Sequence, residues 1–405
     1  MWLRGGATAL IIAFASGVTL AACGGASPGA TSASPGAGAV VAGAASSAVA
    51  RAARSTSPAP SPSPSPSPSA SPSPVRLPAA GNPAGQADVP PAGQPVSTSH
   101  PDHVIGDGTP ASCTSQAVVA AVAAGGVITF SCGPRPVTIT MDATAEVRNT
   151  SRRVVLDGGG MVALSGGGAR RILYMNTCDQ ALGTASSDCF NQQWPRLIVQ
   201  NMTFKDGNST AQQTNDDFGG PSGGGAIFDL GGQLKVVDSR FIGNRCFPTG
   251  PDLGGAAIRA LSQWENRPVY ITSDTFRGGA CSNGGALSSI GVSWVVLNSV
   301  MTRNQAIGSG ANPARSGTPG GGSGGAIYTD GDQYTVTIAG TVIAHNQARE
   351  GGGAIFFVSN NKTGTLTIED SALPDDPSDG FETAGFPGIF YIGQGRPVVT
   401  SSTLG

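Results

Sequence analysis

The motif Gly324-Gly325-Ala326-Ile327 decides how this chain is interpreted, because versions of it recur through the second half of the sequence. The recurring Gly-Gly-Ala triplets begin at Gly224, Gly254, Gly284, Gly324 and Gly352, so successive offsets are 30, 30, 40 and 28 residues. An aliphatic residue follows four of the triplets directly, and the remaining one after a further alanine. A unit of this length cannot bury its own apolar face, so the repeat predicts a stack of similar coils.

A second column of large apolar residues lies inside each unit. It comprises Phe204, Phe241, Phe276, Met301, Ile343, Leu373 and Leu404. Three positions earlier stand Asn201, Asp238, Ser273, Asn298, Gly340, Asp370 and Ser401, mostly polar residues that favour turns. Three positions later stand Gly207, Asn244, Gly279, Asn304, Asn346 and Asp376, a second turn set. Stacked units of this pattern predict a parallel β-solenoid, with coils about 4.8 Å apart.

The cysteines fit the same register. Cys246 lies five residues after Phe241, and Cys281 lies five residues after Phe276. Equivalent positions on adjacent coils are about 4.8 Å apart, which falls within the roughly 4.4 to 6.8 Å that a disulfide accepts between Cα atoms. We therefore predict a disulfide between Cys246 and Cys281.

Seven cysteines are present, and six remain when Cys23 is set aside. An even number in an exported protein predicts three disulfides, although fifteen pairings are formally open. The neighbours in sequence are Cys113 with Cys132, Cys178 with Cys189, and Cys246 with Cys281. The C-x-x-C spacing typical of zinc sites is absent from the sequence.

The first residues are typical of a targeting segment rather than of a fold. Arg4 precedes an almost wholly apolar stretch from Ala7 to Ala22, and Leu20-Ala21-Ala22-Cys23 ends it. This resembles a bacterial lipoprotein signal, and the resemblance implies that Cys23 becomes the lipidated first residue. An ordinary secretory signal or a short transmembrane helix is the alternative. We expect residues 1–23 to be the signal, and the protein to be exported and held at the cell membrane by lipid, facing the extracellular or cell-wall space.

Residues 24–105 are expected to form a disordered tether. They consist largely of Ala, Gly, Ser and Pro with few large apolar side chains, so they cannot build a core. The Ser-Pro run Ser57–Pro74 favours polyproline II and predicts a semi-rigid spacer.

Residues 106–405 are expected to form the folded domain. Near its start, Thr114 or Ser115 can cap a short helix through Gln116–Ala124, which Gly125 ends. Val127–Phe130 then predicts a first strand. We interpret the helix as a cap over the exposed end of the solenoid.

The motifs F-x-x-N (Phe241–Asn244) and G-G-A-I (Gly324–Ile327, Gly352–Ile355) together resemble the repeat of polymorphic outer-membrane proteins. More broadly, residues from about Cys113 to Gly405 are similar to the right-handed β-helix proteins of the pectin lyase-like superfamily. The resemblance implies an all-β, right-handed parallel β-helix. The sequence departs from the outer-membrane family because no barrel segment follows Gly405, so we expect lipid anchoring in its place.

The composition excludes some functions. The formal net charge is −2 and only 12% of residues are charged, so no basic field exists to hold nucleic acid. The 61 Gly suit repeated tight turns rather than a helical bundle.

Carboxylates gather at a few positions that are candidates for chemistry, because lyases of the superfamily need a base with calcium-binding carboxylates, and hydrolases need facing carboxylates. The clusters are Asp216-Asp217, Asp330 with Asp332, and Asp375-Asp376 with Asp379. None matches a catalytic signature of the superfamily. Asp216 and Asp217 are the best candidates for a calcium or sugar contact, with a solvated loop as the alternative, and no other cofactor is expected.

Several other residues receive a structural interpretation. Lys205, Asp206, Arg170, Arg171 and Arg259 are expected to face outward, with a role as bases or sugar contacts as the alternative. Two G-x-S-x-G matches, around Ser222 and Ser323, lie in Gly-rich turns without the strand and helix that a nucleophile requires.

The Asn244, Asn304 and Asn346 column predicts a stacked amide ladder. The insert 308–323 breaks the period and is either a recognition loop or an inert excursion.

The expected function is non-catalytic: a lipid-anchored β-helix that binds envelope or extracellular polysaccharide, or a surface protein in adhesion. The alternative is a polysaccharide lyase or glycoside hydrolase acting in a groove. A purely structural spacer is a third hypothesis. The membrane, through the lipid, and a polysaccharide or surface protein are the expected partners, and nucleic acid is not.

Overall fold

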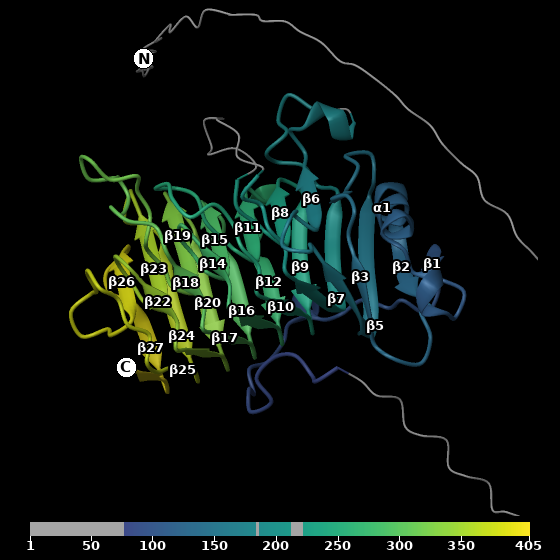
Figure 1. The fold of residues 1–405 in the computed structure, drawn as a ribbon. Helices are drawn as coiled ribbons and strands as arrows, with labels where there is room; N and C mark the ends of the chain where they lie inside the picture. The colour runs from purple at the N-terminus through teal and green to yellow at the C-terminus, as the bar shows by residue number, and fades with distance from the viewer. Residues whose placement is uncertain (1–76, 184–185, 212–221) are drawn as a thin grey trace, which may run out of the picture. The chain divides into compact units, whose positions relative to one another are not determined.

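The computed structural model describes residues 77–183, 186–211 and 222–405, which lie within the compact unit Ala70–Gly405 (Figure 1). Within these ranges the regular structure is almost all β-strand. The exceptions are one α-helix, α1 (Ser115–Ala124), and four short 3₁₀ turns, η1 (Pro91–Gly93), η2 (Pro110–Ser112), η3 (Gln180–Leu182) and η4 (Trp264–Asn266).

The strands form three sheets that run side by side along the stack. The large sheet has 17 strands: β1 (His103–Ile105), β2 (Gly126–Phe130), β3 (Val137–Thr140), β5 (Arg153–Ser165), β7 (Arg196–Lys205), β9 (Gln233–Val237), β10 (Arg240–Ile242), β12 (Val269–Thr272), β13 (Thr275–Arg277), β16 (Trp294–Leu297), β17 (Val300–Thr302), β20 (Thr335–Ala339), β21 (Val342–Ala344), β24 (Thr365–Glu369), β25 (Ala372–Leu373), β27 (Val398–Thr400) and β28 (Thr403–Leu404).

The second sheet has eight strands: β4 (Ala145–Glu146), β6 (Leu173–Asn176), β8 (Ile227–Leu230), β11 (Ile258–Leu261), β15 (Leu287–Ile290), β19 (Ile327–Gly331), β23 (Ile355–Ser359) and β26 (Ile389–Ile392). A short sheet has three: β14 (Ala280–Cys281), β18 (Gln305–Ala306) and β22 (Gln347–Ala348). Most coils contribute one strand to the eight-stranded sheet and two to the large sheet, while β5 and β7 are single long strands that span both positions of the large sheet.

The register of the strands confirms the predicted stack. Every pairing between these strands is parallel. The aliphatic residues after the Gly-Gly-Ala turns pair in one buried column, Ile227, Ile258, Leu287, Ile327 and Ile355. The rings of Phe204, Phe241 and Phe276 stack at 5.2 and 4.8 Å between centroids. The chain is therefore an all-β parallel solenoid around one apolar core.

The predicted turn column between the two strands of the large sheet is also present. Its residues have φ between 45° and 60°, in the left-handed region: Asn201, Asp238, Ser273, Asn298, Gly340, Asp370 and Ser401. Short polar side chains and glycine tolerate this conformation better than branched or bulky ones. The preference for small polar residues at these positions is therefore explained by the left-handed backbone conformation.

The amide ladder is confirmed by its hydrogen bonds. Asn304 Oδ1 accepts from the Gly279 amide at 3.0 Å, and Asn304 Nδ2 donates to the Phe276 carbonyl at 3.2 Å. Asn346 Oδ1 in turn accepts from the Asn304 amide at 2.9 Å. Each buried amide therefore satisfies backbone groups of the preceding coil, which is a structural role.

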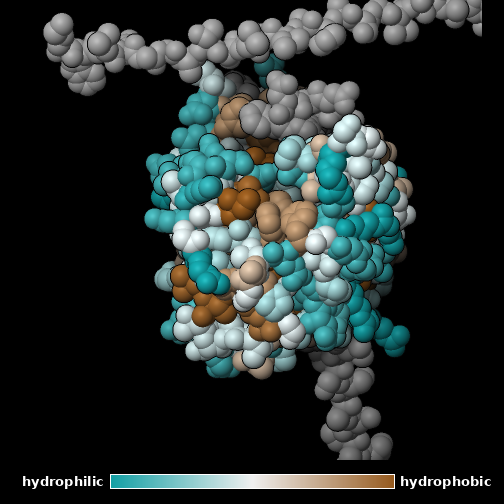
Figure 2. Space-filling view, turned by 90° about the vertical axis from the view of Figure 1, so that its left-hand side faces the viewer, coloured by the Kyte–Doolittle hydropathy of each residue, from teal (hydrophilic) through white to brown (hydrophobic). Residues whose placement is uncertain are grey.

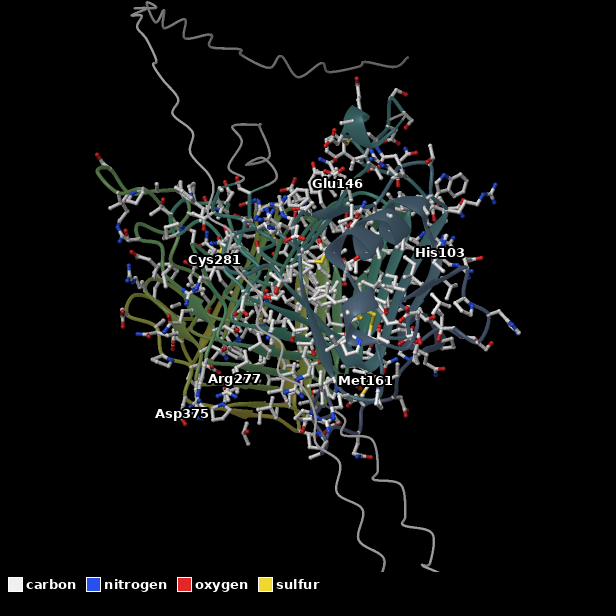
Figure 3. All side chains as sticks on the ribbon, turned by 45° about the vertical axis from the view of Figure 1, so that its right-hand side comes forward. His103, Glu146, Met161, Arg277, Cys281 and Asp375 are labelled. Carbon is white, nitrogen blue, oxygen red and sulfur yellow. A yellow bond between two sulfur atoms is a disulfide. The ribbon has the colours of Figure 1, made fainter. Side chains whose placement is uncertain are left out.

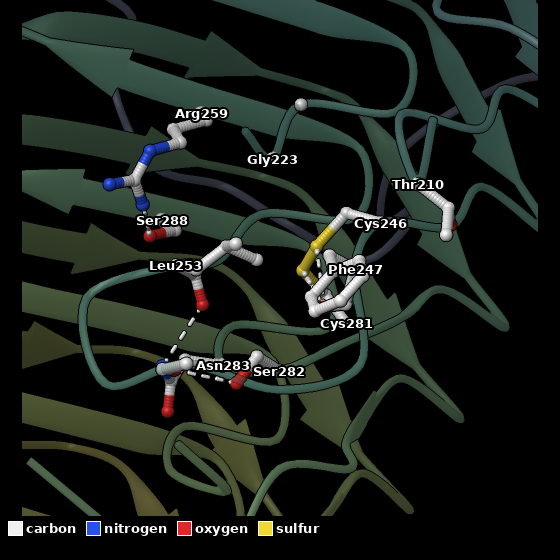
Figure 4. The surroundings of a disulfide bond; sticks show 12 residues. Thr210, Gly223, Cys246, Phe247, Leu253, Arg259, Cys281, Ser282, Asn283 and Ser288 are labelled. Atoms are coloured by element: carbon white, nitrogen blue, oxygen red, sulfur yellow. Dashed lines mark hydrogen bonds between the residues drawn. A yellow bond between two sulfur atoms is a disulfide. The ribbon is translucent and has the colours of Figure 1, made fainter. Parts of the chain in front are cut away.

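Three disulfides join Cys113 to Cys132, Cys178 to Cys189, and Cys246 to Cys281. The last pair links adjacent coils, with 4.7 Å between the Cα atoms, close to one coil spacing (Figure 4). The predicted Cys246–Cys281 bond is therefore present.

Replacing Cys246 and Cys281 together by Ser is expected to lower the free energy of unfolding by about 4 kcal/mol, because the bond restrains a 35-residue loop in the unfolded chain. Chemical denaturation followed by circular dichroism measures the change. Oxidised wild-type protein is the matched comparison, because it differs from the variant only in this bond. Equal stability of the oxidised wild type and the double variant would contradict the expectation.

The helix α1 and its caps agree with the sequence. Thr114 Oγ1 accepts from the Ala117 amide at 3.2 Å, and Gly125 ends the helix with φ 78°. Val118 and Val122 are fully buried against the core. The helix is thus bound to the solenoid by its apolar face.

One expected boundary is wrong. We assigned residues 24–105 to a disordered tether, but residues 77–105 are ordered: 77–102 lie along the large sheet, and His103–Ile105 form β1, which pairs with β2. In Figure 1 the purple trace of this segment runs past the lower ends of the strands toward β1. The segment has few apolar side chains, but the sheet binds its main chain, so it needs no core of its own. We call residues 77–102 the strap.

Candidate functional site

Several predicted site residues lie outside the described residues. They are the proposed lipidation site Cys23 and the calcium or sugar candidates Asp216 and Asp217. Among the residues that the structure describes, no group of three or more His, Cys, Asp or Glu side chains is placed to hold a metal ion. Nor is any helix in these ranges long and apolar enough to cross a membrane.

The insert 308–323 folds back onto the candidate Asp330. Asn312 Nδ2 lies 2.6 Å from Asp252 Oδ1 and 2.8 Å from the hydroxyl of Tyr328, and it also contacts Asp330 Oδ2. Burial, with a contribution from the neighbouring Asp252, raises the pKa of Asp330. The amide thus fills the space between the two carboxylates, so the arrangement is that of a closed polar cluster. Asp332 is exposed.

Two arginines expected to face solvent are buried instead. Arg171 donates from Nε and Nη2 to the carbonyls of Gly224 and Gly223, at 3.0 and 2.8 Å, and burial lowers its pKa to about 9. Arg259 is fully buried, and its Nη1 lies 3.1 Å from Ser288 Oγ. The expectation was wrong because Gly-rich turns cover the outer face of the eight-stranded sheet. Lys205, Arg170 and Asp206 are half-buried or exposed.

Among the residues that the structure describes, neither G-x-S-x-G serine hydroxyl is hydrogen-bonded to a histidine. Ser222 and Ser323 are both buried in Gly-rich turns. His345 pairs instead with Asp375 at 3.5 Å near the C-terminal end, and His103 lies in β1 (Figure 3). The labelled His103 and Asp375 are far apart in that view, so His103 does not belong to the His345–Asp375 pair.

Two hollows contain carboxylates. One, of about 460 Å³, is lined by Leu373, Asp375, Asp376, Pro377, Glu382, Pro387, Gly388 and Gly405. The other, of about 260 Å³, lies between the start of the strap and the turn column, and holds Asp238 and Arg240. Among the described residues that line them, the first hollow holds three carboxylates, Asp375, Asp376 and Glu382, without a Lys or Arg, and the second holds one carboxylate beside Arg240. Asp379 is exposed.

An aromatic surface that was not predicted from the sequence lies beside two strands of the large sheet. Trp194 is 40% exposed, and the guanidinium of Arg152 lies 5.2 Å from the centre of its ring. Trp264 is half-buried, and the guanidinium of Arg267 lies 4.2 Å from the centre of its ring. We call these four residues the tryptophan edge.

Backbone hydrogen bonds place the tryptophan edge on successive coils. The Arg196 amide donates to the Arg152 carbonyl, the Gln233 amide to Pro195, and the Trp264 amide to Gly232, at 3.2, 3.0 and 2.9 Å. The order along the stack is therefore Arg152, Trp194, Gly232 and Trp264.

The geometry of the edge follows from this order. Two coil steps of about 4.8 Å separate the backbones at Trp194 and Trp264, or about 10 Å. The coil between them turns at Gly231-Gly232, which carries no side chains. The space beside these glycines is occupied by Thr177 and by the carbonyls of Cys189 and Pro195.

Neighbouring loops hold the edge in place. The Cys178–Cys189 disulfide closes the loop that leads to Trp194, and Asn191 Oδ1 accepts from the Glu265 amide at 2.7 Å. Glu265 Oε2 lies 3.5 Å from Arg267. The signal available in the sequence was a Trp shortly before each of two strands of the large sheet, at the end of the turn from the eight-stranded sheet.

Comparisons with family models, with curated proteins and with solved structures find no match. The chain is defined by its architecture as a parallel β-solenoid with an aromatic edge.

Proposed function

We propose that this protein is an exported, lipid-anchored β-helix that binds polysaccharide without turning it over, and that the glycan lies along the tryptophan edge. The observation that carries the proposal is the pair of accessible indoles, each stacked on an arginine, on alternate coils.

The chemistry of the edge suits a sugar chain. An indole offers a large, rigid apolar face at small entropic cost, and the C–H faces of a pyranose ring are apolar. The hydroxyl groups around the ring accept hydrogen bonds from guanidinium donors such as those of Arg152 and Arg267. The backbones that carry the two indoles are about 10 Å apart, which is close to the length of two linked sugars, so a single extended chain can contact both.

The finer features of the fold belong to the same proposal. We infer a right-handed solenoid, because crossovers between parallel strands have this hand in nearly all proteins. The repeat motifs support a place in the pectin lyase-like superfamily. The apolar packing of α1 beside β2 and β4 supports its role as an end cap, because it lies at the first coils.

The disulfides support export, because such bonds persist mainly in oxidising compartments. The apolar segment that ends in Cys23 is the feature that supports lipid anchoring.

Replacing Trp194 and Trp264 by Ala is expected to weaken glycan binding about tenfold for each, on the scale of 1.4 kcal/mol per lost ring. Retention on a panel of polysaccharides, recorded together with new reducing ends and unsaturated products, measures binding and turnover separately.

Val398→Ala is the matched control, because Val398 is 53% exposed in β27 on the last coil, and Figure 2 shows apolar side chains at that end of the molecule. Retention that is equal in the tryptophan variants and the control would refute the tryptophan edge. Turnover by the wild type would replace the binding function with an enzymatic one.

A further inference from the structure

The strap is bound largely through its main chain by side chains of the solenoid, and the side chains of Asn82, Thr98 and Asp102 add hydrogen bonds of their own. Asn298 Oδ1 accepts from the Ala87 amide at 2.8 Å, and Asn298 Nδ2 donates to the Ala87 carbonyl at 2.9 Å. Gln200 makes the same pair of bonds to Val96, at 2.9 and 3.0 Å. Each amide thus imitates a neighbouring β-strand and recognises one peptide unit irrespective of its side chain.

Further contacts are also to strap carbonyls. Arg240 Nη1 donates to the carbonyls of Pro78 and Ala79, at 2.6 and 3.0 Å. Lys235 Nζ donates to the carbonyl of Gln94 at 2.6 Å. The solenoid therefore supplies amide and cationic donors to an extended chain along several coils.

The apolar contribution is small and local. Val96 packs on an external cluster formed by Val127, Val155 and Ile198, which is separate from the solenoid core. A Cβ on Gly93 would lie 3.0 Å from the ring of Tyr270, so the strap passes close over that ring.

The fit is closest at Gly85. A Cβ there would lie 2.6 Å from the Gly340 carbonyl and 2.7 Å from Asn298 Oδ1. Gly85 does not have the left-handed φ of many other glycines, so a side chain at this position is opposed by the groove and not by the local backbone.

We propose that the outer face of the large sheet is a docking groove for an extended polypeptide main chain, and that the strap is its detachable intrachain occupant. The groove accepts in trans a chain of the strap's own chemistry, an extended proline-containing segment such as the strap of a second copy. This inference goes beyond glycan binding and does not depend on it, because the groove and the tryptophan edge use different residues.

The physical basis for detachment is the difference between the strap and the coils. The strap contributes one half-buried valine to a cluster outside the core, whereas each coil buries a complete set of apolar side chains. Local opening is cheapest where few apolar contacts are lost, so the strap opens without unfolding the solenoid. The high local concentration of a tethered segment keeps it docked at rest.

Hydrogen exchange of the full chain tests the detachment. We expect the amides of Ala87 and Val96 to exchange at least tenfold faster than that of Ile128 in β2, and Gly85→Ala to accelerate them at least tenfold further. Gln86→Ala, at an exposed strap position, is the matched control and leaves the rates unchanged. The thermal midpoint of the solenoid stays within 2 °C in both variants, about the resolution of the scan. Strap amides that exchange only at the rate of β2 would overturn the proposal.

Binding in trans tests the groove itself. A fluorescent peptide of residues 77–102 is expected to bind the Gly85→Ala protein at least tenfold more tightly than the wild type, because the resident strap no longer competes. Adding Gln200→Ala to that variant removes both bonds to Val96 and should reverse the gain. Equal anisotropy with wild type and Gly85→Ala would show that the face does not accept a chain in trans. Retention on glycans is measured in parallel, so failure of the groove and failure of the tryptophan edge are distinguishable.

Discussion

Replacing Ile327 by Asp is expected to abolish cooperative folding of the solenoid. Ile327 is fully buried in β19, in register with Leu287 on one side and Ile355 on the other. The substitution removes an apolar side chain from the core and places an uncompensated carboxylate there, which together cost roughly 5 to 10 kcal/mol. This equals or exceeds the whole stability of many domains. Thermal unfolding followed by circular dichroism measures the loss.

Thr335→Asp is the control for the first prediction. Thr335 lies in β20 on the same coil, but its side chain is exposed, so a carboxylate there remains hydrated. A cooperative transition in Ile327→Asp at the temperature of the control would show that the Gly-Gly-Ala column is not the core of the fold.

Replacing Asp376 by Asn is expected to stabilise the protein above pH 7. Asp376 occupies the next position of the amide ladder, where its Oδ1 accepts from the Asn346 amide at 2.7 Å and from Asn346 Nδ2 at 2.8 Å. Its Oδ2 is buried with no hydrogen-bond partner. Burial, with repulsion from Asp375 and Glu382, raises the pKa of Asp376 from 3.8 to about 7. An amide has the same shape without a charge.

The direction of the pH effect follows from this shift. Between pH 4 and 7 the folded chain keeps the Asp376 proton that the unfolded chain has lost, so folding takes up a proton and stability falls as pH rises. The stabilisation that protonated Asp376 gives the folded chain is fully present below the pKa of Asp376 in the unfolded chain, and it is lost by about pH 7. A shift of this size corresponds to about 4 kcal/mol. Asn at this position removes the dependence.

Urea unfolding of wild type and Asp376→Asn at pH 4 and pH 8 measures the effect. We expect similar stability at pH 4 and a clear advantage of the variant at pH 8, with local fraying of the last coils in the wild type. Asp332→Asn, at an exposed position that does not contribute to the pKa shift of Asp376, controls for the change in net charge. The same pH slope in wild type and Asp376→Asn would contradict the prediction.

The coils were predictable because their determinants repeat. A left-handed residue, an apolar residue three positions later and a turn residue three positions after that recur once per coil, so the same pattern is present many times in one sequence. The Cys246–Cys281 bond followed from the same register.

The site was less predictable, because its parts do not repeat. Trp194 and Trp264 belong to different coils, separated by 70 residues in the sequence, and only the stacking of those coils places them on one edge. Arg171 was assigned to the surface because its charge favours water. Its burial depends on two glycine carbonyls, 52 and 53 residues further along the chain, that accept its hydrogen bonds.

The sequence by itself determined the all-β stack, the positions of its turns, the amide ladder and the expected disulfide of adjacent coils. These depend on the period and on the preferences of single residues, which are local. Only the tertiary structure decided that the strap is ordered and that two tryptophans share an edge. The strap has no apolar pattern of its own, because its order comes from Asn298 and Gln200, more than 100 residues away in the chain. Contacts between the main chain and distant side chains do not produce a repeating sequence pattern. They can be identified only once the coils are stacked in the structure.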